Sequence, residues 1–116
     1  MSIERHEVGS RMSQAVVHNG VAYLAGQVAV DRPGQSVDAQ TENILQRIDK
    51  YLSDAGTDKS KLLSAQIWLA DISTFNQMNE VWDGWVAQGN PPARACVESQ
   101  LAAPQFTVEI MVTAAV

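Results

Sequence analysis

The sequence contains one cysteine, two histidines and no long apolar run, and each shortage removes a class of protein. A single cysteine forbids a disulfide within the chain, and His6 and His18 are too isolated to indicate a metal site. No stretch approaches the roughly 20 apolar residues of a membrane-spanning helix. The first ten residues, MSIERHEVGS, lack the apolar core of a secretory signal. We therefore expect a cytoplasmic protein that has no structural metal and does not enter a membrane.

Basic residues are also scarce. The chain carries 8 Lys and Arg against 13 Asp and Glu, a formal net charge of −5, and it has no basic stripe. This balance repels the phosphates of nucleic acids, so no nucleic-acid partner is expected. The hydrophobic fraction of 46% and the charged fraction of 18% are those of a folded globular protein. Because 116 residues are enough for a single core, we predict one domain over 1–116.

The chain does contain a succession of short periodic segments. Asn19 and Gly20, within the apolar segment 15–30, both tolerate a positive φ and therefore predict a hairpin with a two-residue turn. Residues 37–55 carry apolar side chains at helical spacing, and Gly56 suits the position just beyond the end of a helix.

A second helix is predicted to begin at Thr74, with Gln77 as its capping-box partner, and to end at Gly89. Alternating or apolar segments predict three further strands, over 61–70, 92–98 and 106–114. The order of these elements predicts an α+β domain, with two helices packed on one face of a mixed sheet.

Two helices can cover only one face of such a sheet. The more apolar positions are expected to face the helices: Leu63, Ile67, Leu69, Ala93, Ala95, Val97, Val108, Ile110 and Val112. Alternation then places on the opposite face Gln66, Trp68, Arg94, Cys96, Glu98, Thr107, Glu109, Met111 and Thr113. This second set mixes polar and apolar residues, as interfaces and clefts do. We expect an oligomer whose helix-free faces meet, with the site there.

Arg94 is the first candidate for that site, because a guanidinium on a half-buried strand needs an anion. Glu98 lies roughly 13 Å along the same strand, too far to be its obvious partner. Glu109, flanked by two apolar residues in the final strand, is the better neighbour. Two interpretations remain open. Either Arg94 and Glu109 form a structural ion pair, within one chain or between subunits, or Arg94 binds the carboxylate of a ligand while Glu109 handles a water.

Three other residues have both a structural and a functional interpretation. Cys96 has no histidine base that can be placed near it, so a small buried side chain whose backbone contributes polar groups is favoured over a nucleophile. Gly26 is either an ordinary strand glycine or a point where the backbone approaches a ligand closely. Asn79, in the second helix, is either a solvated surface residue or part of the site.

Several segments together resemble a known family. The segments LAGQV, QT at the start of the first helix, LADISTFNQMNEVWDGWV, PPARACVE and VEIMVTAA are similar to those of the Rid family, the YjgF-type enamine and imine deaminases. The resemblance covers nearly the whole chain. It implies a chorismate-mutase-like fold and a homotrimer with clefts between subunits. It also implies hydrolysis of 2-imino and enamino acids, such as 2-aminoacrylate and 2-iminobutyrate, to 2-ketoacids and ammonia without a cofactor.

The resemblance also implies roles for particular residues. Arg94 matches the family's carboxylate-binding arginine, and Glu109 matches its water-positioning glutamate. Cys96, Gly26 and Asn79 match residues that line the cleft.

Met12 stands where many members have a cleft tyrosine, which suggests a separate branch of the family. This replacement leaves a second hypothesis open, a non-catalytic homotrimer that binds small carboxylate metabolites.

Overall fold

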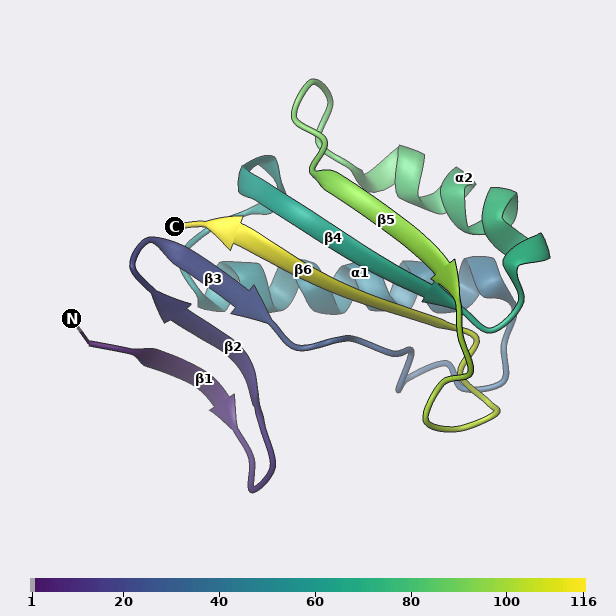
Figure 1. Ribbon diagram of the computed structural model, residues 1–116, viewed down its shortest axis with the longest axis horizontal. Coiled ribbons are helices and arrows are strands. Elements are labelled where there is room, and N and C mark those ends of the chain that lie inside the picture. Colours follow the sequence, from purple (N-terminus) through teal and green to yellow (C-terminus); the bar gives the residue numbers. More distant parts are fainter. Residues whose placement is uncertain (1) are drawn as a thin grey trace.

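The computed structural model describes residues 2–116 and confirms the predicted α+β architecture. Six strands form one sheet in the order β1-β2-β3-β6-β4-β5, and both helices lie on the same side of it (Figure 1). The strands are β1 (Glu4–Val8), β2 (Ser13–His18), β3 (Val21–Leu24), β4 (Leu62–Leu69), β5 (Ala93–Glu98) and β6 (Val108–Ala115). The helices are α1 (Val37–Asp54) and α2 (Phe75–Trp85), with short 3-10 turns η1 (Lys59–Lys61) and η2 (Ile72–Thr74). No helix in the described part of the chain is long and apolar enough to cross a membrane.

The predicted hairpin is confirmed as β2 and β3. Asn19 and Gly20 have φ values of 52° and 80°, the left-handed conformation that this two-residue turn requires. Strand β1 was not predicted. Its sequence, ERHEV, shows no apolar alternation because it forms the outer edge of the sheet and pairs only with β2.

Helix α1 follows its prediction closely. The Ser36 side chain accepts a hydrogen bond from the Ala39 backbone N–H at the N-terminus, and Gly56 adopts φ +86° just beyond the C-terminus. Ile44 and Ile48 are fully buried against the sheet side of the molecule.

Helix α2 departs from its prediction at both ends. The capping box is absent, because the Thr74 hydroxyl donates to the carbonyl of Asp71 and the Gln77 amide donates to Asp38. The helix also ends at Trp85 and not at Gly89.

The predicted division of the sheet into two faces is wrong for β5 and right for most of β4 and β6. Residues paired across neighbouring strands point to the same face. Arg94 pairs with Ala65, and Cys96 pairs with Ile67, whose side chain is fully buried under the helices. Arg94, Cys96 and Glu98 therefore face the helices, whereas Ala93, Ala95 and Val97 lie on the helix-free face. Leu63 is also exposed, because the β4–β6 register shifts between Leu62 and Ser64.

Candidate active site

Arg94 is held by α2 and not by a carboxylate. Its Nη1 donates to Oδ1 of Asn79 at 2.8 Å. Its guanidinium carbon lies 5.3 Å from the centre of the Trp82 ring and 5.7 Å from that of Phe75, which are cation–π distances. Among residues 2–116, no Asp or Glu forms an ion pair with Arg94. The guanidinium is thus oriented but retains donors for an anion, beside a hollow of about 580 Å³ that Glu80 and Asp83 also line.

The side chain of Cys96 has a structural role, whereas its backbone N–H and C=O point to the outer edge of the sheet. Its side chain packs against the core cluster, and burial raises the pKa of its thiol, an effect that the nearby Arg94 charge partly offsets. Strand β5 is the edge of the sheet. Because the Ser99 N–H donates to Leu69 of β4, alternation turns the N–H and C=O of Arg94 and Cys96 away from β4. These groups can therefore bind a ligand next to the guanidinium.

Glu109 lies on the other side of the sheet, against Gly26. A Cβ built at residue 26 would collide with Oε2 of Glu109 and would lie 3.1 Å from its Cδ. Burial raises the pKa of the Glu109 carboxyl above its ordinary value. Within the described residues, no hydrogen bond or ion pair reaches this carboxylate. Glycine is thus needed here for the close approach of the Glu109 side chain, whereas the close approach of a ligand stays a prediction.

Gln27, which the sequence analysis did not single out, fixes the position of Gly26. Its backbone N–H donates to Ile110 at 2.8 Å, and its own carbonyl accepts from the Ile110 N–H at 3.1 Å. Its buried amide donates to Gln14 at 2.8 Å and accepts from Nε of Arg47 at 3.1 Å. The Gln27 side chain therefore links the main chain beside Glu109 to both β2 and α1 through hydrogen bonds. A polar residue within the otherwise small and apolar segment 24–30 was the signal available for it.

We expect Gly26→Ala to impair the reaction proposed below without unfolding the protein. The added methyl group would force the Glu109 carboxylate away from its position, and misplacing a catalytic group by about 1 Å can cost on the order of a hundredfold in rate. Steady-state kinetics, with circular dichroism to check the fold, measures the effect. Gly84→Ala is the matched control, because a Cβ there meets no atom within 4 Å. Equal rates for Gly26→Ala and the wild type would show that Glu109 need not lie over Gly26.

The expected site residues thus fall into two groups that one protomer cannot bring together. Arg94, Asn79 and the Cys96 backbone lie on the helix side at the β5 edge, whereas Glu109 and Gly26 lie on the helix-free side near the middle of the sheet. The predicted neighbourhood of Arg94 and Glu109 within one chain is therefore wrong, and so is an ion pair between them in one protomer.

Met12 is separate from the Arg94 group within one protomer, whereas Gln14, two residues further along the chain, contacts the Gly26 segment by accepting from the Ala25 N–H at 2.9 Å. It is exposed in the loop between β1 and β2, and β2 lies four strand positions, roughly 19 Å, from β5. Across residues 2–116, no three His, Cys, Asp or Glu side chains cluster as metal ligands would.

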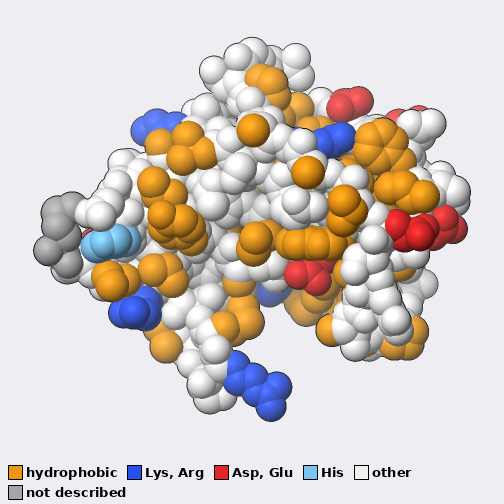
Figure 2. Space-filling model, viewed as in Figure 1, with side chains coloured by type: hydrophobic (Ala, Val, Ile, Leu, Met, Phe, Trp, Pro, Cys, Tyr) orange, Lys and Arg blue, Asp and Glu red, His pale blue; other side chains and the backbone are white. Residues whose placement is uncertain are grey.

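The helix-free face carries the apolar surface expected of an interface. Tyr23, Val97 and Met111 lie on it by register and are each at least 41% exposed. Figure 2 shows apolar side chains spread over the middle of this face, with few charges among them. Exposed apolar side chains gathered on one face are typical of protein contact surfaces, so this face is suited to contact with another protein surface.

Comparison with known proteins identifies the class and then the family. The architecture is the chorismate-mutase-like α+β fold that was expected. The crystal structure of NMB1025 from Neisseria meningitidis, a YjgF family member, matches with a TM-score of 0.95 and 43% identity over 99% of this chain and 95% of that chain. A Rid family structure, YyfA from Yersinia pestis, matches with a TM-score of 0.85 and 31% identity over 94% and 90% of the two chains.

The sequence comparisons agree with the structural ones. A RutC family protein of Haemophilus ducreyi is 47% identical over 116 residues, covering 98% of this chain and 97% of the relative. The family model described as Endoribonuclease L-PSP matches residues 3–116. The chain belongs to this family, known also as the Rid, YjgF or RutC family.

Proposed function

We propose that this protein hydrolyses reactive 2-imino and enamino acids to 2-ketoacids and ammonia. The observation that carries the proposal is the state of Arg94. Its guanidinium is held by Asn79 and two aromatic rings, has no carboxylate partner among the described residues, and adjoins the outward-facing backbone of an edge strand. Such a group suits a small planar carboxylate, which it can bind through two parallel charge-assisted hydrogen bonds.

Glu109 supplies the second half of the chemistry. As a carboxylate it accepts a proton from a water, whose oxygen adds to C2 of the protonated imine. The resulting carbinolamine loses ammonia as its C–N bond breaks and its hydroxyl becomes the carbonyl, so that one water is consumed for each ammonia released. Because Glu109 is partly buried, its raised pKa makes it a stronger base than an exposed glutamate. A protonated imine is already electrophilic, so this reaction calls for no cofactor.

The two halves come from different copies of the chain. Arg94 of one protomer faces Glu109 and Gly26 of its neighbour, with the exposed apolar residues of the helix-free face buried between them. A closed ring of such head-to-tail contacts forms one cleft per interface, and a homotrimer has three. Within one protomer, Arg94 and Glu109 lie on opposite faces of the sheet and cannot contact the same small substrate.

Mixing two inactive variants tests the shared cleft. Arg94→Ala and Glu109→Gln protomers are unfolded, combined in equal amounts and refolded together. If protomers assemble at random into cyclic oligomers, about a quarter of the clefts receive an intact Arg94 and an intact Glu109. We expect the mixture to recover about that fraction of wild-type activity on 2-iminobutyrate generated by an amino-acid oxidase. Each variant refolded alone is the control. A mixture no more active than its components would contradict a cleft built from two protomers.

A second candidate is a non-catalytic homotrimer that binds small carboxylate metabolites. The position of Met12 favours it, because a thioether cannot transfer a proton as a tyrosine hydroxyl does. This alternative retains Arg94 and has no use for a water activated by Glu109.

The family model's description names an endoribonuclease. The net charge of −5 and the position of His6 and His18 on β1 and β2, away from Arg94, do not support ribonuclease activity.

A further inference from the structure

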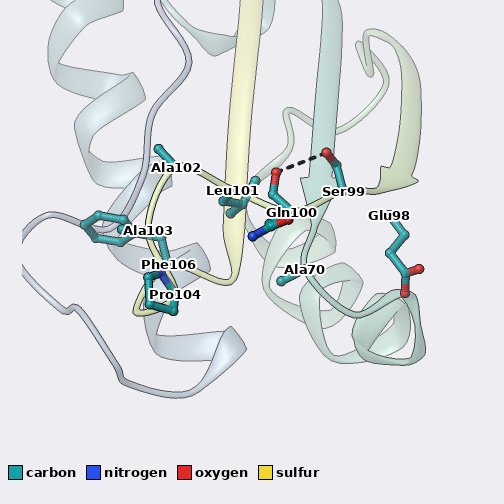
Figure 3. A pocket seen from close by; sticks show the side chains of 9 residues that line it. All are labelled: Ala70, Glu98, Ser99, Gln100, Leu101, Ala102, Ala103, Pro104 and Phe106. Carbon is teal, nitrogen blue, oxygen red and sulfur yellow. Dashed lines mark hydrogen bonds between the residues drawn. The ribbon is translucent and has the colours of Figure 1, made fainter.

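A hollow of about 440 Å³ lies at the end of the sheet where β4 finishes and β6 begins. The connection from β5 to β6 crosses this end, since β4 lies between those two strands in the sheet. Figure 3 shows Leu101 and Ala70 beside the strand ends, with the rest of the connection forming a wall. The apolar lining consists of Ala70, Leu101, Ala102, Ala103, Pro104 and Phe106. Its volume falls in the range of small-molecule sites.

One lining residue of the hollow, Ala70, lies on the same side of the sheet as Glu109. Glu109 pairs with Trp68, and Ala70 follows directly after β4, roughly 7 Å from Trp68 and on the same side of the sheet. The Ala70 N–H donates to the carbonyl of Thr107, two residues before Glu109, so the strand pairing continues to the edge of the hollow. A group that extends from a carbon atom attacked near Glu109 can therefore reach the hollow.

The wall of the hollow is already fixed in place. Gln40 of α1 is fully buried, and its Nε2 donates to the Gln105 carbonyl at 3.0 Å, while its Oε1 accepts from the Thr107 N–H at 3.0 Å. The three polar lining residues are Glu98, Ser99 and Gln100, and the Glu98 carboxylate accepts from the Ile72 N–H at 3.0 Å. The hollow is thus preformed, and six of its nine lining residues are apolar, which suits an uncharged apolar group.

We propose that this hollow receives the side chain of the substrate and selects apolar side chains of isobutyl or benzyl size over methyl. This inference rests on the proposed function, because it takes the reacting carbon to lie beside Glu109. The carboxylate of the substrate then binds Arg94 of the neighbouring protomer, and its side chain extends past Trp68 towards Ala70 and Leu101. The methyl group of 2-aminoacrylate-derived substrates would leave the hollow unfilled.

Binding of two ketoacid products tests the hollow without requiring turnover. Isothermal titration calorimetry compares 4-methyl-2-oxopentanoate with pyruvate on wild type, Ala102→Trp and Gln88→Trp. Because burial of added apolar carbon favours binding, we expect the wild type to bind the larger ketoacid about tenfold more tightly. Ala102→Trp fills the hollow and should reduce that ratio to about one, with pyruvate affinity unchanged. Gln88→Trp, at an exposed position between α2 and β5, should keep the wild-type ratio.

Three results would overturn the inference: a wild-type ratio near one, an equal loss of both ligands in Ala102→Trp, or no binding of either ketoacid. Failure of the proposed reaction would be seen separately, as a lack of turnover in a wild-type protein that still discriminates between the two ketoacids. Ala70→Phe provides a second filling variant from the opposite wall, and it must reproduce the loss of discrimination. A filled variant that retains the full preference would also contradict the proposal.

Discussion

Arg94→Ala should abolish imine hydrolysis while leaving the fold and the proposed oligomer intact. The substitution removes two charge-assisted hydrogen bonds to the substrate carboxylate, and we expect kcat/KM to fall by about a thousandfold. The fold should survive because β5 is an edge strand and the Arg94 side chain, which is only half-buried, has no ion-pair partner in the described chain. The measurement is ketoacid release from 2-iminobutyrate, with circular dichroism and size-exclusion chromatography as structural checks.

Two further variants make the Arg94 result specific. Arg94→Lys keeps the charge but cannot form the planar two-bond contact, so its activity should lie between those of the wild type and Arg94→Ala. Arg32→Ala is the matched control, because it removes an arginine whose partner is Glu42 on the surface at 3.3 Å. Hydrolysis by Arg94→Ala at the wild-type rate would disprove the role assigned to Arg94.

Glu109→Gln should separate binding from turnover. The amide keeps the shape of the carboxylate but cannot take a proton from water, so we expect the turnover rate to fall by about a hundredfold or more. Affinity for the ketoacid product should change little, because the carboxylate contact belongs to Arg94. Glu42→Gln on the surface of α1 is the matched control. Unchanged turnover in Glu109→Gln, with binding retained, would favour the non-catalytic binding protein.

Because the pKa of Glu109 is raised, Glu109→Gln should change how both turnover and the free energy of unfolding depend on pH. Wild-type turnover requires the deprotonated carboxylate, so it should decline as pH falls through the raised pKa, and that decline should be missing from the residual activity of Glu109→Gln. In the folded state the carboxyl holds its proton to a higher pH than in the unfolded chain. The free energy of unfolding therefore falls as pH rises from the unfolded pKa through the folded one. Glu109→Gln removes this loss, so it should be more stable than the wild type above that window and lose the advantage below it.

The sequence by itself determined the elements that depend on local chemistry. Asn19 and Gly20 specify their turn because both accept positive φ, and residues 37–54 specify α1 through apolar spacing between Ser36 and Gly56. It also determined the family, because motifs such as PPARACVE are local strings. Strand β1 was missed, since an exposed edge strand does not need an apolar face.

Only the tertiary structure decided which way β5 faces. The segment ARACVE alternates alanine with arginine and cysteine, and composition suggested that the alanines would turn toward the helices. The parallel register with β4 turns them the other way, because α2 offers Arg94 an amide oxygen and two aromatic rings in place of an apolar surface. The face of the sheet to which a side chain points depends on the register of its strand with the neighbouring strand. A shift of one residue moves every side chain of the strand to the opposite face. That reversal separates Arg94 from Glu109 in one chain and makes a second copy necessary to complete the proposed site.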